Sequence, residues 1–379
     1  MVSQISRMDN SLMGRWWWTV DRWTLLALGL LMGLGVILSF SASPSVADHL
    51  KLGSFYFVIR HIAFIVPSVV VLIGVSLLPL KLIKRLALFL FLLSIVLLIL
   101  TPIIGAEIKG ARRWISVAGF SFQPSELIKP AFAVLSAWMF SEAHVNPHIP
   151  GNLISGALYL TVVGLLVMQP DLGMTVLISC AWFAQFFFAG LSIIWILLGI
   201  GAGVGGVILA YFLLPHVSRR IDQFLDPTAG DRFSDKYQIN QSLDALMNGG
   251  LLGQGPGEGV IKRALPDAHA DFVFAVAGEE FGLIMGLIIS LLFLFIVLRN
   301  FFRIFHEANL FIILAVAGLI IQFGLQALIN IASTLNLIPT KGMTLPFLSY
   351  GGSSMLAVSI GMGMVLSLTR RHADESKRW

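Results

Sequence analysis

Long, nearly uncharged stretches of apolar residues recur along the chain. A helix needs about 20 such residues to cross the hydrocarbon core of a bilayer, whereas a barrel strand alternates apolar and polar residues over about ten. The stretches here do not alternate, so the pattern predicts an all-α polytopic membrane protein. Ten spans can be marked, at residues 23–40, 62–78, 86–104, 125–140, 153–168, 172–189, 192–214, 272–298, 308–331 and 347–368.

The composition agrees with this fold class. Of 379 residues 57% are hydrophobic and 12% charged, and the mean hydropathy is +0.88, which excludes an ordinary soluble domain. The net charge of +5 comes from basic residues between the spans, which favours membrane lipid over nucleic acid as a partner. Cys180 lies in an apolar run, and we expect a small buried side chain with no disulfide.

An even number of spans places both ends of the chain on one side of the membrane. Arginines and tryptophans precede the first span and basic residues follow the last, so this side is predicted to be cytoplasmic. We expect a cytoplasmic segment at 1–22, a membrane domain at 23–368 with a large extracytoplasmic loop at 215–271, and a cytoplasmic tail at 369–379. A cleaved signal peptide is the alternative at the N-terminus, but the apolar run exceeds the usual length of about 7–15 residues.

The predicted outer loops are unexpectedly basic. A loop as long as 215–271 can escape the positive-inside rule, but the short loops 105–123 and 336–346 cannot. These cations either face an anionic ligand at the outer leaflet, the interpretation that we prefer, or contact lipid headgroups nonspecifically. They are Lys109, Arg112, Arg113, Arg219, Arg220, Arg232, Lys236, Lys262, Arg263 and Lys341.

The loop after the third span contains the sequence KGARRWI at 109–115. Arg112 and Arg113 suit forked contacts to phosphate oxygens, and Trp114 suits a sugar face. The alternative is that this group anchors the loop at the membrane interface.

The fourth span opens with QPSELIKP at 123–130, with a proline early in the helix. Glu126 and Lys129 are three residues apart and therefore share a helical face. They form either a structural ion pair or a site in which Lys129 reaches a substrate phosphate. Asp171, in the short turn before the sixth span, is expected to cap that helix, although contact with a sugar or cation stays open.

The stretch from Gly253 to Gly282 passes from a glycine-rich loop into an apolar helix that still contains acids. On a continuous helix Asp271 and Glu279 share one face, about 12 Å apart along the axis. Ionisable groups at membrane depth are functional candidates. An apolar surround would raise the pKa of Asp271 towards that of a useful base, whereas the alternative role is a helix cap.

Three other sequence features bear on which ligands the protein could bind. The glycines between 249 and 259 either let backbone amides approach a diphosphate or form a flexible connection, and no nucleotide-binding motif is present. His269 has no neighbouring His or Cys cluster that would support a metal site. The serines and glycines at 349–354 permit close helix packing.

Six stretches taken together resemble the SEDS family of polytopic peptidoglycan glycosyltransferases, and its cell-division branch more than its elongation branch. They occur in family order over nearly the whole chain, although each alone would be a weak signal. The family commonly has Glu and Thr where Asp267 and Ala270 stand. The six are GARRWI (110–115), QPSELIKP (123–130), QPDLG (169–173), QSLDALMNGGLLGQGPGEG (241–259), LPDAHADFVFAVAGEEFG (265–282) and PTKGMTLPFLSYGGSS (339–354).

The resemblance implies a ten-helix SEDS fold in the bacterial inner membrane. It implies that the protein polymerises lipid II into β-1,4 glycan at the division septum and releases undecaprenyl diphosphate. The catalytic acid of the family corresponds to Asp271, and its Arg-Trp pair to Arg113 and Trp114. The other candidates for substrate binding are Arg112, Glu126, Lys129, Lys262, His269, Glu279, Lys341 and Ser349.

The resemblance also implies partners. These are a class B penicillin-binding protein transpeptidase (FtsI-like), other divisome membrane proteins and membrane lipid, with no nucleic acid. No cofactor is obligatory, but a divalent cation, Mg²⁺ or Mn²⁺, is compatible with a diphosphate substrate. Two other functions stay open: a lipid II flippase, against which the lack of an inverted repeat argues, and a non-catalytic divisome scaffold.

Overall fold

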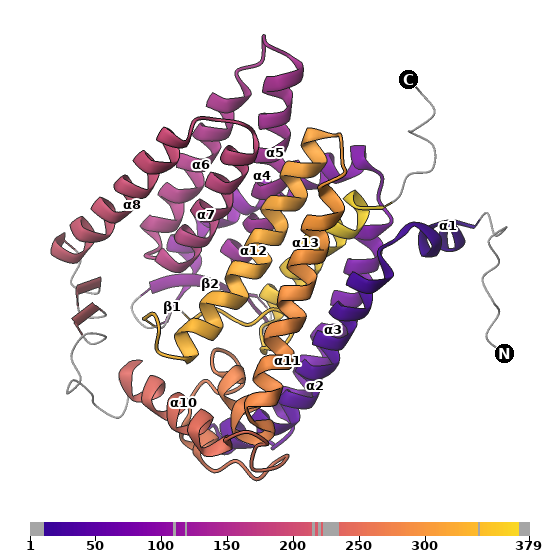
Figure 1. Cartoon of the computed structure of the whole chain (residues 1–379). Coiled ribbons are helices and arrows are strands. Elements are labelled where there is room, and N and C mark those ends of the chain that lie inside the picture. Colours follow the sequence, from indigo (N-terminus) through magenta and orange to yellow (C-terminus); the bar gives the residue numbers. More distant parts are fainter. Residues whose placement is uncertain are drawn as a thin grey trace.

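A computed structural model describes residues 11–108, 111–117, 120–213, 217–218, 221–222, 235–339 and 342–370. Each predicted span falls largely within one helix of this part of the chain (Figure 1). A short helix, α1, precedes them at Leu12–Thr19. The helices that contain the spans are α2 (Arg22–His49), α3 (Tyr56–Ser76), α4 (Leu80–Ile104), α5 (Pro124–Val145), α6 (Gly151–Met168), α7 (Leu172–Phe188), α8 (Ile193–Leu213), α11 (Val273–Ile304), α12 (Leu310–Thr334) and α13 (Gly352–Leu368).

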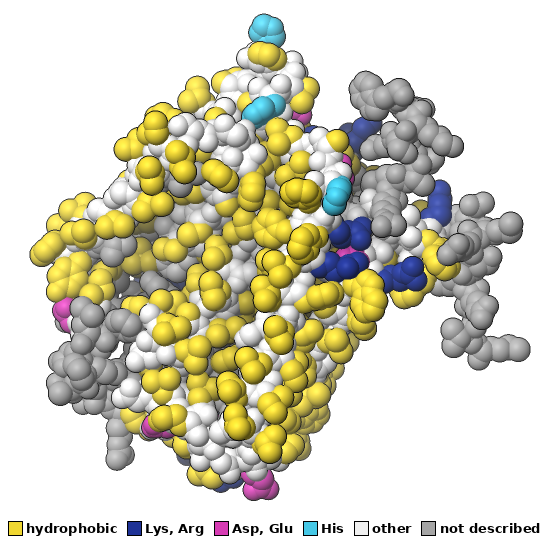
Figure 2. All heavy atoms as spheres, in the orientation of Figure 1, with side chains coloured by type: hydrophobic (Ala, Val, Ile, Leu, Met, Phe, Trp, Pro, Cys, Tyr) yellow, Lys and Arg dark blue, Asp and Glu magenta, His cyan; other side chains and the backbone are white. Residues whose placement is uncertain are grey.

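The molecule is a mostly helical polytopic membrane protein. In the described part of the chain, seven helices are long and apolar enough to cross a membrane, namely α2, α3, α4, α6, α8, α11 and α12. The helices α7 and α13 are apolar but shorter. Hydrophobic side chains cover most of the face seen in Figure 2, as expected of a surface that meets lipid tails. Cys180 lies on such a surface, so the expectation that it is buried is wrong.

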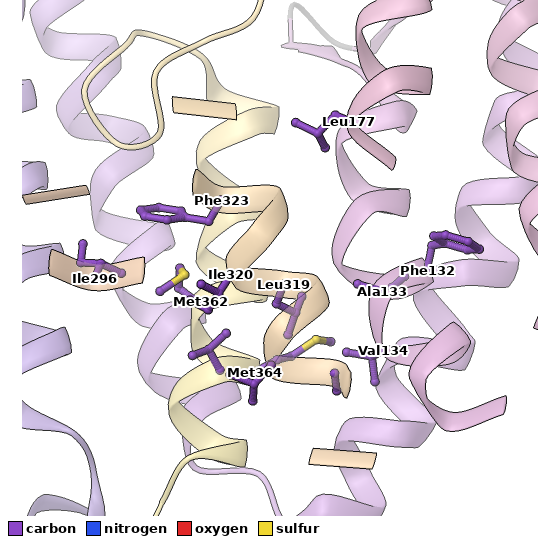
Figure 3. Packing of buried hydrophobic residues seen from close by; sticks show 14 of the residues in the cluster. Phe132, Ala133, Val134, Leu177, Ile296, Leu319, Ile320, Phe323, Met362 and Met364 are labelled. Atoms are coloured by element: carbon purple, nitrogen blue, oxygen red, sulfur yellow. The ribbon is translucent and has the colours of Figure 1, made fainter. Parts of the chain in front are cut away.

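The centre of the bundle is α5, which is buried over most of its length. It packs against α4, α6, α12 and α13, which together cover most of its surface. Figure 3 shows Phe132, Ala133 and Val134 of α5 in the same cluster as Leu319 of α12 and Met364 of α13. The helix α8 lies at the edge of the bundle in Figure 1, next to α7.

The expectation of an all-α chain needs one correction. Residues between α4 and α5 form a small antiparallel sheet in the order β1-β2-β3, from β1 (Ala106–Ile108), β2 (Ala111–Val117) and β3 (Phe120–Phe122). The loop is too polar to enter the bilayer, and its backbone groups are satisfied by strand pairing instead. Since side chains alternate along a strand, Arg113 and Trp114 point to opposite faces of β2.

The predicted loop at 215–271 is partly structured. It contains α10 (Asp235–Gly249) and the 3-10 helix η1 (Ile261–Ala264). With the start of α11, the C-terminal end of α2 and the N-terminal end of α3, this region forms a hydrophobic cluster separate from the main core. We call residues 235–281 the outer unit. Residues of the second cluster include Ala42, Val46, Phe57, Ala245, Leu265, Ala268, Phe272, Ala275 and Val276.

The helix α11 is broken at Gly282, where φ is +73° and ψ is −174°. The loop after α10 fills the break. Its amides at Gln254 and Gly255 donate to the carbonyls of Glu279 (2.9 Å) and Glu280 (3.0 Å), and Leu283 N donates back to Gly250 O at 2.9 Å. Two carbonyls at the end of the first segment and the Leu283 amide at the start of the second are therefore satisfied by the loop.

Candidate active site

Asp271 lies at a junction of three chain segments. It is partly exposed and precedes α11, whose N-cap residue is Phe272. Its backbone carbonyl accepts a hydrogen bond from Asn330 Nδ2 at 2.8 Å, and a Cβ added to Gly342 would lie 3.4 Å from its Oδ2. The predicted shared helical face with Glu279 is wrong, because α11 begins only at Val273.

Ser349 fixes the backbone next to Asp271. Its hydroxyl donates to Ala270 O at 2.5 Å and accepts from Leu345 N at 2.8 Å. The amide of Tyr350 donates to His269 O at 2.9 Å. Ser349 itself is only 3% exposed, so in this structure it contacts the protein and holds the segment that carries Asp271.

His269 belongs to a small aromatic cluster. Its ring centroid lies 4.2 Å from that of Phe57 and 5.4 Å from that of Tyr350. Burial lowers the pKa of His269 to about 4, and the charge of Asp267 acts in the opposite direction. The imidazole is therefore neutral at physiological pH. It supplies a flat, uncharged wall two residues from Asp271.

Lys262 and Glu279 lie together in the outer unit, within a buried network. Lys262 Nζ pairs with Glu280 Oε1 and donates to Ser41 O of α2 at 3.0 Å. Glu279 accepts the backbone amides of Ile261 and Lys262, each at 2.8 Å. Because these charged groups have partners inside the protein, the structure favours a structural role for them over contact with substrate.

The glycine-rich loop has a function that its sequence alone did not reveal. A Cβ at Gly249 would overlap the carbonyl oxygen of Gly278, and one at Gly253 would overlap that of Glu280. Glycine is therefore required for the loop to approach α11 closely, and two of its amides are occupied there. Gly278 of α11 faces α10, and Gly282 faces this loop.

Glu126 and Lys129 form the predicted ion pair, with Lys129 Nζ 2.7 Å from Glu126 Oε2. Lys129 also donates to Gln326 Oε1 of α12 at 2.6 Å. Gln326 in turn donates to Thr344 O at 2.9 Å. Lys129 borders a small pocket, whose walls include Gln322, Gln326 and the apolar side chains of Leu319, Phe323 and Met362.

Gln326 and Asn330 were not predicted as site residues. They are four residues apart on α12, so they share one face, and they link Lys129 at one end to Asp271 at the other. Each also binds a backbone carbonyl in the loop before α13, at Thr344 and Met343. The sequence did contain a signal for these two residues, because polar side chains inside an apolar span are candidates for a functional site.

Arg113 and Asp171 meet beside the end of α6. Arg113 donates to Gln169 O at 3.1 Å and Pro170 O at 2.5 Å. Asp171 caps α7, as predicted, and accepts from Met174 N at 3.4 Å. Burial raises the pKa of Asp171, and the nearby Arg113 guanidinium partly opposes that shift.

The remaining basic candidates are dispersed. Arg112 is exposed and lies 3.4 Å from Glu107, on the sheet, while Trp114 pairs with Ala106. Lys341 lies outside the described residues, as do Lys109, Arg219, Arg220 and Arg232. Among the residues described, no group of three or more His, Cys, Asp or Glu side chains is placed to hold a metal ion. We therefore assign no step to a divalent cation.

The chain is similar to known proteins over nearly its whole length. A chain from Caulobacter vibrioides named "Probable peptidoglycan glycosyltransferase FtsW" is 46% identical over 372 residues, covering 97% of this chain and 93% of the relative. One of the same name from Coxiella burnetii is 35% identical, covering 93% and 96%.

Solved structures share the fold. A chain from a peptidoglycan synthase complex, studied for the coordination of polymerization and crosslinking, matches with a TM-score of 0.76 and 26% identity, over 92% of this chain and 97% of that one. The rod shape determining protein RodA of Thermus thermophilus matches with a TM-score of 0.69 and 25% identity, over 93% and 97%. The model of the cell cycle proteins FtsW, RodA and SpoVE matches residues 22–374. The chain belongs to the FtsW/RodA/SpoVE family of cell cycle proteins.

Proposed function

We propose that the chain is a peptidoglycan glycosyltransferase that polymerises lipid II into β-1,4 glycan strands during bacterial cell division. The names of its relatives support this activity over 97% of the chain, and the division branch agrees with the TKGMTLPFLSYGGSS run before and at the start of α13. The products are a lengthened glycan and undecaprenyl diphosphate.

The observation that carries the mechanism is the position of Asp271. The residue is partly exposed, while hydrogen bonds to the carbonyls of Asp271 and Ala270 fix the backbone that bears its carboxylate. In our mechanism it removes the proton from the 4-hydroxyl of the acceptor sugar as that oxygen attacks the anomeric carbon of the donor. The C–O bond to the diphosphate breaks, and configuration inverts. A base must lie within hydrogen-bond reach of this proton, which a fixed backbone favours.

Negative charge develops on the departing diphosphate, so cations near it stabilise the transition state. Lys262 is 4% exposed and paired with Glu280, so we give it the lowest priority for this role. Lys341 lies outside the described residues and stays a candidate from its place in the sequence. Lys129 stays a candidate because it borders a small pocket.

We further propose ten membrane crossings with both ends of the chain in the cytoplasm. The start of α2 and the ends of α11 and α13 meet at one end of the bundle, which supports this topology. Arg299 Nη2 lies 2.6 Å from Asp21 Oδ1, and Arg303 Nη2 donates to Thr369 O at 2.5 Å. A class B penicillin-binding protein is the proposed partner at the septum, since one structural neighbour comes from a peptidoglycan synthase complex.

The test is polymerisation of labelled lipid II by purified protein together with its transpeptidase partner. Asp271→Asn removes the proposed base and retains the shape of the side chain, so we expect activity to fall by about 100-fold or more. Asp244→Asn, on the exposed side of α10, is the matched control and is expected to be active. Normal polymerisation by Asp271→Asn shows that this carboxylate is not the base.

Two further measurements test the alternative functions, a lipid II flippase and a scaffold. Vesicles with labelled lipid II report headgroup translocation, and translocation without any glycan product identifies a flippase. A scaffold predicts that Asp271→Asn supports normal cell division.

A further inference from the structure

Glu279 is a buried charged group of the outer unit whose two carboxylate oxygens both have partners. It is 0% exposed and accepts three N–H groups, from Ile261 N, Lys262 N and Asn248 Nδ2 (3.1 Å). Both carboxylate oxygens are engaged by the chain itself. A group that is fully buried and fully partnered has no access to a sugar or phosphate, so its function must act through the protein.

The contacts of Glu279 close a ring in the chain. They join the first residues of η1 to α11, and the residues between, 263–278, form a closed loop with Asp271 near its middle. Joining the two ends of a loop reduces the number of conformations that it can adopt. The carboxylate of Asp271 thereby gains a fixed backbone from the outer side of the site, independent of Asn330 on the inner side.

Further contacts attach this ring to α2 and to the loop after α10. Lys262 Nζ pairs with the buried Glu280 and donates to Ser41 O of α2. The loop after α10 holds the other end of the ring, because Gln254 N and Gly255 N donate to the carbonyls of Glu279 and Glu280. Movement of the ring therefore requires breaking contacts to α2, to α10 or to the loop after α10.

Buried charge is an expensive way to gain stability. Replacing a buried ionic network with apolar side chains is often neutral or stabilising, so such networks are weak evidence for a role in stability alone. Glu279 differs from an apolar side chain because its two oxygens accept directional hydrogen bonds from two specific backbone amides. This fixes the register of η1 against α11, and with it the place of Asp271.

We propose that Glu279 is a positioning residue for Asp271, acting by clamping η1 to the first segment of α11. The proposal rests on the proposed function of Asp271 as the base. It replaces the sequence-based expectation that Glu279 binds substrate. Loss of the clamp lets the ring relax and moves the carboxylate out of reach of the acceptor hydroxyl, while the surfaces that bind lipid II are unchanged.

The first test is steady-state kinetics of Glu279→Gln with its partner transpeptidase. The amide keeps one acceptor oxygen but turns an NH₂ group towards a backbone N–H, so at least one clamp contact is lost. Since misplacing a catalytic group by about 1 Å lowers rates by about 100-fold, we expect kcat to fall by about 10- to 100-fold with KM within about threefold. Glu258→Gln, an exposed glutamate of the same loop, is the matched control with wild-type kcat.

A second variant protects the test against misfolding. Glu279→Asp retains the buried negative charge but is too short to reach both amides. It is expected to fold and to lose less kcat than Glu279→Gln. This graded rescue by a carboxylate separates positioning from substrate binding, for which KM would rise.

The position of residue 271 can also be measured without activity. In a Cys180→Ala background, a cysteine placed by Asp271→Cys reacts with a soluble maleimide at a rate set by its exposure. Adding Glu279→Gln is expected to change this rate by at least about threefold, whereas Glu258→Gln leaves it unchanged.

The outcomes distinguish the two proposals. If Asp271→Asn polymerises normally, the proposed base is wrong. If Asp271→Asn is inactive while folded Glu279→Gln and Glu279→Asp show wild-type kcat and an unchanged labelling rate, the base stands and the positioning role of Glu279 is overturned.

Discussion

The side-chain amide of Asn330 donates to the backbone carbonyl of Asp271 at 2.8 Å, which ties the proposed base to the C-terminal part of α12. The same NH₂ group donates to Met343 O at 2.6 Å. One turn earlier on α12, Gln326 makes the corresponding link between Lys129 and the backbone of Thr344. The helix α12 therefore sets the spacing between the two charged parts of the site.

Asn330→Ala removes both donors and leaves two carbonyls without this partner. We expect an unfolding free energy lower by about 2 kcal/mol, from the lost hydrogen bonds. We also expect kcat to fall by about tenfold, because the base is less well placed. Thermal unfolding and lipid II polymerisation measure the two effects. Asn146→Ala, at the exposed end of α5, is the control, and equal behaviour of the two variants contradicts the prediction.

The buried pair of Glu126 and Lys129 should be sensitive to loss of either partner. Both side chains are 4% exposed, so Glu126→Gln or Lys129→Met alone leaves a buried charge uncompensated and is expected to destabilise the protein by about 3–5 kcal/mol. The double variant removes both charges and should recover most of the unfolding temperature. A double variant no more stable than the single ones would contradict this account.

The activity of that double variant addresses the alternative raised by the sequence. If polymerisation returns together with stability, the ion pair is structural only. If the double variant is stable and inactive, Lys129 acts on the substrate as well.

The glycine loop offers a matched pair of substitutions. Gly253 and Gly257 both have φ of +84°. A Cβ added at Gly253 would overlap Glu280 O, whereas a Cβ added at Gly257 would meet no nearby atom of the described residues. Gly257→Ala is expected to lose about 1 kcal/mol from the left-handed backbone alone. Gly253→Ala should lose at least about 2 kcal/mol more, because the loop must also leave the break in α11.

The difference between the two variants is measurable by thermal unfolding and by hydrogen exchange at the amides of Gln254 and Gly255. Faster exchange is expected only in Gly253→Ala. Identical exchange in both variants would show that the close approach to α11 is unimportant.

The depressed pKa of His269 predicts a pH dependence of stability. The folded protein holds this imidazole neutral down to about pH 4, whereas in the unfolded chain it takes up a proton below its ordinary pKa of 6.5. The neutral form is therefore favoured by folding. Its contribution is complete above pH 6.5 and is lost as the pH falls towards about 4, by at most about 3 kcal/mol.

Unfolding temperatures at about pH 7 and about pH 5 measure this effect. His269→Phe keeps the ring contact with Phe57 but cannot be protonated, so it should show a smaller decrease between the two values than the wild type. His306→Phe, at an exposed position, should leave the decrease unchanged. A decrease of equal size in all three proteins would exclude His269 as its source.

Local sequence patterns predicted much of the fold, because the apolar length of each span is read directly from the chain. The cap at Asp171 and the ion pair of Glu126 and Lys129 were predictable for the same reason, since both depend on spacings of a few residues. The break at Gly282 was not. A straight helix across 272–298 satisfies the same pattern, and what opens it is the loop at 249–255, which lies far away until the chain folds.

The sequence by itself determined the class of protein, the approximate helices and the family, since these follow from residue order alone. Only the tertiary structure decided which charges serve the site. Lys262, Glu279 and Asp271 are all ionisable residues in or beside an apolar segment, so the sequence alone does not distinguish them. The fold buries Lys262 and Glu279 against partners inside the protein, whereas Asp271 is partly exposed. The physical reason is that burial and pairing of a charge depend on segments distant in the chain, such as Ser41 and Asn330, whose approach no local pattern encodes.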